Sequence, residues 1–228
     1  MLDSTLAPTL APTLAPTLAP TLAPTLAGHT LDPYFHVCAF FNSRDEEYRV
    51  LSDYYREGLD GGEKALHIVD PDLRRDHKRR LEASGIDVEG CEACGQLEVR
   101  SWQEAYLQTG LFDQDQMLVT VEKVLAASVS AGFPRIRIMG NMGWAVAGRP
   151  DSDELIEYEA RVNDVLSRTR QPAICVYDTD TLSGTMLMDI LRAHPLTLVG
   201  GVVHENPLFT PPAQLLAEIR ARRVTTPA

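Results

Sequence analysis

Two pairs of side chains in this sequence have the type and spacing of ligands for a metal ion or a small molecule. His36 and Cys38 lie two residues apart in one short apolar segment. Cys175 and Tyr177 have the same spacing in another. Because alternate side chains of a strand point to the same face of a sheet, each pair should share a face. If the two strands are neighbours, the histidine and the two cysteines could converge, with His194 near the end of the next helix as a fourth ligand.

Thiolates and imidazoles in one cluster suit zinc or another borderline-soft metal. The expected metal set is therefore His36, Cys38, Cys175 and His194. The alternative interpretation is that the thiols are small buried apolar groups and that the histidine is hydrogen-bonded within the core.

A separate Cys-x-x-Cys pair, Cys91 and Cys94, stands between Gly90 and Gly95 and is expected in a loop. One such pair is half of a zinc site, and the sequence has no second pair to complete it. A redox pair would need a position that lowers a thiol pKa, such as a helix N-terminus. The pattern favours incidental loop thiols.

The residues after a predicted strand at 136–139 form another candidate site. Gly140, Asn141 and Trp144 place flexible backbone, a carboxamide and an indole at the carboxyl end of this strand. Ligands of open α/β sheets bind at that edge, although Trp144 could equally close the core beneath a loop. Glu159, on the next predicted helix, could face this crevice or solvent.

The elements that would position these residues alternate along the chain. Apolar runs predict strands at residues 34–41, 65–69, 97–99, 136–139, 173–177 and 196–203. Helical spacing predicts helices after the capping-box pattern at 43–46 and at 72–84, 102–108, 115–131, 151–168, 184–193 and 211–223. Such alternation is typical of a three-layer α/β fold, with a mostly parallel central sheet and helices on both faces.

The N-terminal segment has a different texture. Thr-Leu-Ala-Pro occurs five times from Thr5 to Pro24 and is followed by a truncated copy. A proline every fourth residue is incompatible with a helix, and the pattern has no strand alternation. We therefore expect a disordered arm over residues 1–28, a spacer rather than a docking ligand, and a single domain over residues 29–228.

Composition narrows the choice of partners. The 228-residue chain has a net charge of −11 and no basic stripe, which disfavours direct binding to nucleic acid or to an anionic membrane. The sequence has no apolar run of membrane-spanning length and no basic signal-peptide start. Four cysteines without an export signal suggest reduced thiols, so a cytoplasmic location is expected.

The common enzyme motifs are missing from the sequence. The first predicted strand runs into residues 42–45, which lack the glycines and the lysine of a phosphate-binding loop. Residues 140–143 have the wrong spacing for a dinucleotide fingerprint, and no hydrolase or zinc-protease motif occurs. The sequence therefore predicts a protein that is not an enzyme.

A series of short motifs, in order, resembles the MEDS domain, the methanogen/methylotroph DcmR-type sensory domain. The similarity extends from about Gly28 to Phe209. The motifs are residues 36–41, Glu57-Gly58-Leu59 with Glu63, residues 95–97, 106–113, Arg137 to Gly140 with Trp144, Tyr158-Glu159 with Asn163, residues 175–178, and His194-Pro195.

The resemblance implies a divergent RecA/KaiC-like domain that has lost its phosphate loop. It also implies a role in sensing small hydrocarbon derivatives, such as halomethanes or methylated compounds, with a protein partner providing the output in signal transduction or transcriptional control. Two alternatives are a ligand-independent protein-interaction regulator, in an anti-sigma or kinase pathway, and a residual nucleotide binder. Combining family pattern and residue chemistry, the candidate ligand-binding residues are His36, Cys38, Asn141, Trp144, Glu159, Cys175, Tyr177 and His194.

Overall fold

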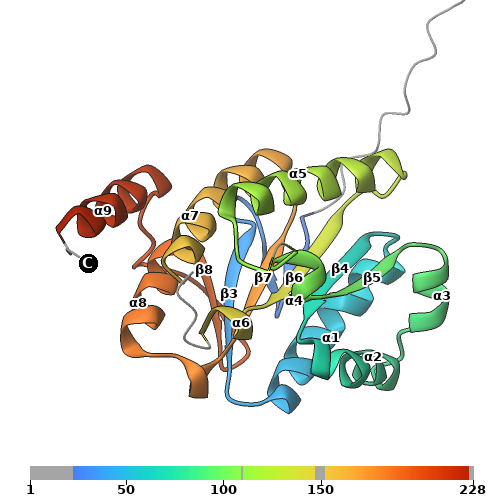
Figure 1. Cartoon of the computed structure of the whole chain (residues 1–228). Helices are drawn as coiled ribbons and strands as arrows, with labels where there is room; N and C mark the ends of the chain where they lie inside the picture. The colour runs from blue at the N-terminus through green and yellow to red at the C-terminus, as the bar shows by residue number, and fades with distance from the viewer. Residues whose placement is uncertain (1–22, 109, 147–151, 226–228) are drawn as a thin grey trace, which may run out of the picture.

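A computed structural model describes residues 23–108, 110–146 and 152–225. A seven-stranded sheet forms the middle layer, and helices cover both of its faces (Figure 1). This confirms the predicted three-layer α/β fold. The expected arm lies outside the described residues as far as residue 22.

The strand order in the sheet is β5-β4-β6-β7-β3-β8-β9, and every neighbouring pair is parallel except β8 and β9. The central strands β3 and β7 are buried nearly throughout, as expected for a sheet covered on both faces. The strands are β3 (His36–Phe41), β4 (Lys64–Val69), β5 (Leu97–Ser101), β6 (Ile136–Asn141), β7 (Ala173–Asp178), β8 (Leu196–Val199) and β9 (Val202–Glu205).

Two apolar cores lie on opposite faces of the sheet. On one face pack α1 (Arg44–Asp60), α2 (Arg74–Ala83) and α3 (Val88–Ala93). The other face is covered by α4 (Trp102–Ala105), α5 (Gln114–Ser130), α6 (Gly143–Val146), α7 (Ser152–Thr169), α8 (Gly184–Ala193) and α9 (Pro212–Thr225). Two short 3₁₀ turns, η1 (Pro71–Leu73) and η2 (Thr179–Thr181), follow β4 and β7. None of the helices in these described ranges is long and apolar enough to cross a membrane.

The folded part of the chain begins earlier than expected. Residues Thr25–Leu26 (β1) pair antiparallel with His29–Thr30 (β2) in a small hairpin. Leu26 is fully buried in the core on the α1 face, and Thr25 donates a hydrogen bond to Glu57 on α1. The expected boundary at residue 28 is therefore too late. The last repeat copy packs because Gly28, at a positive φ, turns the chain back on itself.

Two further elements differ from the prediction. The expected loop around Cys91 contains α3, which begins because the Asp87 side chain accepts a hydrogen bond from the backbone N–H of Gly90. The expected last strand, 196–203, is a hairpin. It turns at Gly200 and Gly201, whose positive φ values suit a tight β-turn.

A buried ion pair fixes α1 to the sheet. Glu63 accepts hydrogen bonds from Arg135, at 2.6 Å, and from Arg137. Arg137 also donates to the Tyr54 carbonyl at 2.6 Å and lies over the Tyr54 ring. Its side chain occupies the place where a Cβ of Gly58 would be. This contact explains why a glycine stands inside α1.

Candidate functional site

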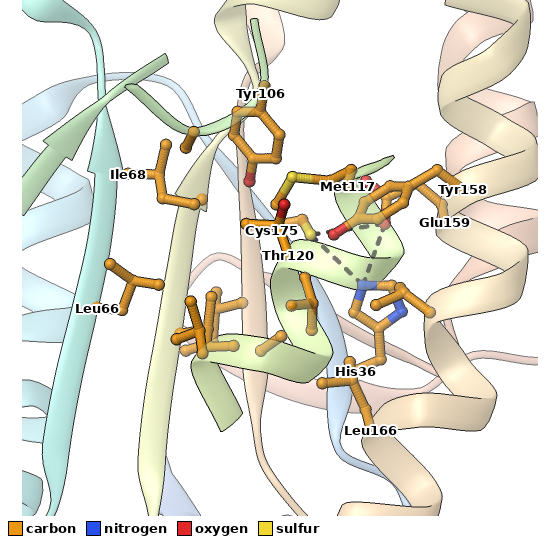
Figure 2. A pocket seen from close by; sticks show the side chains of 18 of the residues that line it. His36, Leu66, Ile68, Tyr106, Met117, Thr120, Tyr158, Glu159, Leu166 and Cys175 are labelled. Atoms are coloured by element: carbon orange, nitrogen blue, oxygen red, sulfur yellow. Dashed lines mark hydrogen bonds and ion pairs between the residues drawn. The ribbon is translucent and has the colours of Figure 1, made fainter. Parts of the chain in front are cut away.

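A small cavity lies between the sheet and helices α5 and α7. Its volume, measured as the space open to the centre of a water molecule, is about 30 Å³, which exceeds what one water needs. Most of its wall is apolar, and Figure 2 shows the side chains that line it. These include Leu66, Ile68, Met117, Val121, Ile138 and Leu166.

One side of the cavity is polar. His36 from β3, Glu159 from α7 and Cys175 from β7 line this side, and all are buried (Figure 2). The Nε2 atom of His36 lies 3.2 Å from Glu159 Oε2 and 3.4 Å from Cys175 Sγ. Cys175 Sγ is 3.7 Å from the same carboxylate oxygen. Three chemically different groups therefore meet at one point.

His194 completes this cluster. It caps the C-terminus of α8, and its ring centroid lies 4.0 Å from that of His36. Its Nε2 atom is 3.5 Å from Glu159 Oε2. The donor atoms of His36, Glu159, Cys175 and His194 all lie within 4.8 Å of one another. We call these four residues the polar cluster.

The hydrogen-bond partners of His36 and His194 determine which ring nitrogen of each imidazole carries the hydrogen. His194 Nδ1 lies 2.8 Å from the Ile190 carbonyl, so Nδ1 carries the hydrogen. His36 Nδ1 lies 3.1 Å from the Asn163 oxygen. The Asn163 amide nitrogen donates to the carbonyls of Glu159 and Ala193, so its oxygen is the acceptor and His36 Nδ1 is a donor. Both Nε2 atoms therefore direct a lone pair into the polar cluster.

Burial disfavours the charged form of each of these groups. Desolvation lowers the pKa of His36 to about 4 and that of His194 to about 3. It raises the pKa of Glu159, against the opposing effects of His194 and of hydrogen bonds from Tyr177 and Cys175. The pKa of Cys175 is raised by burial and by the Glu159 carboxylate.

The structure meets the condition of strand adjacency on which this site depends. β3 and β7 are parallel neighbours, with Cys38 beside Cys175. Tyr177, as expected, is on the same face and donates to Glu159 Oε1 at 3.3 Å. Cys38, a member of the expected metal set, does not belong to the polar cluster, because its Sγ atom faces the Leu196 carbonyl of β8 at 3.5 Å. Glu159 takes its place.

Two other expected site residues belong neither to the cavity lining nor to the hydrogen bonds of the polar cluster. Trp144 is buried, and its ring packs on Tyr106 and Phe112 at centroid distances of 5.1 and 4.9 Å. Trp144 packs behind Tyr106, which lines the cavity, and so has the alternative role given above, that of closing the core. Asn141 caps the turn into α6, since its side chain accepts from the Gly143 backbone N–H at 3.1 Å.

Asn141 lies instead in a second pocket, at the carboxyl ends of β3, β6 and β7. This pocket is where a nucleotide would be expected in a sheet of this kind. Its described lining includes Asp70 and Asp178 together with Arg44 and Ser43. Carboxylates at this position would repel phosphate groups, so the pocket offers little support for nucleotide binding.

Sequence reasoning missed several residues of the site. Tyr106 and Thr120 line the cavity, and Asn163 orients His36. Asn163 follows Glu159 by four residues, which places both on one helix face. A polar amide and a carboxylate together on an otherwise apolar helix face would have been a usable signal, because buried polar side chains require partners.

The Cys91 and Cys94 thiols do not form a second site. Cys91 lies in the second half of α3 and Cys94 is its C-cap, so neither thiol is at the helix N-terminus. Burial raises the pKa of Cys91, which makes its thiolate less available. Both are free thiols in the structure.

The sheet order and the polar cluster define the class of fold: a three-layer, mostly parallel α/β domain with a buried polar site beneath one layer of helices. The fold is similar to that of a KaiC-like protein from Pyrococcus horikoshii. The TM-score is 0.52 at 15% sequence identity, covering 72% of this chain and 69% of that one. The chain belongs to the MEDS family, the MEthanogen/methylotroph, DcmR Sensory domain, whose model matches residues 35–195.

A curated relative is the transcriptional repressor DcmR of Methylorubrum extorquens, which is 26% identical over 170 residues. The match covers 74% of this chain and 61% of the relative. The chain therefore matches about three fifths of the repressor's length. Together with the family, this relative indicates a sensory and regulatory role for the domain.

Proposed function

We propose that this domain senses a small, mostly apolar molecule that binds in the cavity between the sheet and helices α5 and α7. The observation that carries the proposal is the combination of an apolar wall with a single polar side, formed by His36, Glu159 and Cys175. Ligand sites commonly pair apolar enclosure with a few polar groups that fix orientation.

The dimensions of the cavity favour a very small ligand. A space of about 30 Å³ exceeds the requirement of one water molecule, but it is far too small for a nucleotide. Halogenated or methylated one-carbon compounds fit this description. Their halogen or methyl groups would contact the apolar side chains, and their polarised end would face the polar side formed by His36, Glu159 and Cys175.

We propose further that the domain does not catalyse a reaction and that it passes its signal to a protein partner. Residues 42–45 lack the lysine and glycines that position phosphates in the related nucleotide-hydrolysing folds. The named relative is a transcriptional repressor, which supports an output in transcriptional control. The net charge of −11 argues that DNA contact would come from the partner.

The test is a melting-temperature series with halomethanes of increasing size, from chloromethane to tetrachloromethane. A ligand that binds only the folded state stabilises it by about 2.7 kcal/mol at a hundred times its Kd. We expect saturable stabilisation by the small members and a loss of effect for the largest. Val121→Phe, which fills the cavity from α5, should abolish the shift.

Val119→Phe is the matched control, because it places the same ring on the same helix at a position that is 43% exposed. It should leave the response to the small halomethanes intact. If no halomethane or methylated compound such as methanol shifts the melting temperature, or if both variants respond equally, the cavity is not the sensing site. A ligand-independent regulator would then be the better description.

A further inference from the structure

We infer that the polar cluster is a metal-ion site, suited to Zn²⁺ or a similar borderline-soft divalent cation. The inference goes beyond the proposed sensing function, because the site could hold a metal whether or not the cavity holds a ligand. Its donor atoms come from two strands and from two helical segments: Nε2 of His36, Nε2 of His194, a carboxylate oxygen of Glu159 and Sγ of Cys175.

Four of the six spacings between these donors are close to those of a tetrahedral site, and all six are within 4.8 Å. Typical Zn–N, Zn–O and Zn–S bonds give distances of about 3.3–3.6 Å between the ligand atoms of a tetrahedron. In the structure, His36 Nε2 lies 3.2 Å from Glu159 Oε2 and 3.4 Å from Cys175 Sγ. The Glu159 oxygen lies 3.5 Å from His194 Nε2 and 3.7 Å from Cys175 Sγ. A metal ion would therefore require only small movements of the side chains.

The orientation of the imidazoles gives a second, independent reason. His194 is fully buried, and its Nε2 atom has no hydrogen-bond partner within the described ranges of the chain. The Nδ1 hydrogen on the other side of the ring is held by the Ile190 carbonyl. Metal-binding histidines usually have this arrangement, in which one nitrogen donates to a carbonyl and the other binds the ion.

His36 repeats the same arrangement with a different partner. Its Nδ1 donates to Asn163, so its Nε2 lone pair also points into the polar cluster. His36 Nε2 lies 3.4 Å from Cys175 Sγ, whereas His194 Nε2 is buried without a hydrogen-bond partner in the described part of the chain, which is unfavourable for a polar atom. A shared cation satisfies both lone pairs at once.

Charge also favours a divalent ion. A carboxylate and a thiolate together carry two negative charges, which balance one divalent cation inside an otherwise apolar region. Mixed nitrogen, sulfur and oxygen ligands suit zinc better than magnesium or calcium, which prefer oxygen alone. A set of neutral groups joined by hydrogen bonds, with protons on Glu159 and Cys175, is the competing description.

The experiment is metal analysis of the full chain, purified without chelators or a polyhistidine tag. We expect about one zinc ion per chain, or the uptake of about one Co²⁺ ion by metal-free protein. Cobalt bound to Cys175 should show thiolate-to-metal charge-transfer absorption. Cys175→Ser should abolish this band, and His194→Gln should lower the cobalt affinity at least tenfold.

Cys38→Ser is the matched control, since Cys38 is an equally buried thiol on the same sheet face but faces Leu196. It should keep the metal and the absorption band. Urea unfolding of each metal-free variant establishes that the domain still folds. A wild-type chain that neither contains zinc nor takes up cobalt overturns the inference, as does metal that survives in the Cys175 variant.

Val121→Phe separates this inference from the proposed function. It should retain the metal while losing the response to halomethanes, because Val121 lines the cavity but is not one of the cluster residues. Metal binding without any halomethane response would refute only the proposed function. A halomethane response in metal-free protein that takes up no cobalt would refute only the metal site.

Discussion

Glu47 is a buried carboxyl group in the first turns of α1, on the opposite side of the sheet from the cavity. Desolvation raises its pKa to about 7, although Arg44 and Arg80 act in the other direction. In the unfolded chain the same group has an ordinary pKa of 4.5. The folded state therefore holds a proton that the unfolded state releases between pH 4.5 and pH 7.

Because the pKa is raised on folding, its favourable contribution is complete below pH 4.5 and is lost as the pH rises through 7. The loss amounts to roughly 3 kcal/mol. Glu47→Gln removes this pH dependence. Its free energy of unfolding, relative to wild type, should rise by that amount between pH 4.5 and pH 8, as measured by urea denaturation.

The carboxyl can also be followed directly by NMR in the folded protein. A titration midpoint near 4.5 for Glu47, or a difference between the two proteins that stays constant with pH, would contradict the prediction.

At the level of single residues, sequence reasoning found the site chemistry only in part. His36, Cys175 and His194 were predicted from residue type and spacing, and all belong to the polar cluster. Glu159 was expected to face either the crevice or solvent, because the sequence alone does not say which side of α7 faces the sheet. Cys38 was misplaced because alternation fixes the face of a strand but not the direction of a small side chain.

Among the helices, α1 contains a glycine whose role becomes visible only through its contact with the sheet. A Cβ at Gly58 would lie 2.5 Å from Arg137 Nε and 2.7 Å from Cδ. Arg137 cannot move aside easily, because Glu63 and the Tyr54 carbonyl hold it. Gly58→Ala should therefore destabilise the domain by about 2–4 kcal/mol, despite the higher helix propensity of alanine.

Urea denaturation of Gly58→Ala measures this cost, and Gly184→Ala serves as the control. Gly184 begins α8, and a Cβ there meets nothing within 4 Å. The control should be neutral or slightly stabilising. Equal effects of the two substitutions would show that the Arg137 contact does not explain the glycine.

The predicted elements were mostly right because apolar periodicity is strong in the buried strands and long helices. α8 was predicted with its observed bounds, Gly184–Ala193. α3 was missed because Gly90 and Gly95 suggested a loop, whereas Asp87 provides a cap that requires a small residue at Gly90. β1 was missed because a proline-rich repeat gives no local sign that its last leucine packs against a helix.

For the molecule as a whole, the sequence predicted the layers but not the order of the strands. The polar cluster exists because β7 returns to the middle of the sheet beside β3, although 131 residues separate Phe41 at the end of β3 from Ala173 at the start of β7. The pairing of strands so far apart in the sequence follows from packing of the complete core, and no local sequence pattern encodes it. The predicted site was therefore conditional on an adjacency that only the structure could supply.

His194 is a member of the polar cluster and also the C-cap residue of α8. Through this position, the buried cluster is connected to helices at the surface of the domain. Asn206 ties the carbonyls of Leu191 and His194 together, and Arg192 joins α8 to Glu218 on α9. Any occupant that displaces the His194 ring must strain or relieve these contacts.

Hydrogen–deuterium exchange should therefore report occupancy at a distance. Addition of Zn²⁺ or of a bound halomethane should slow amide exchange in the last turn of α8 and in α9. Amides of α2 and α3, which pack on the opposite face, should exchange at unchanged rates. A uniform change over all helices would mean global stabilisation without a directed signal. Met188 on α8 is 46% exposed, so a change confined to α8 and α9 would be accessible at the surface of the domain.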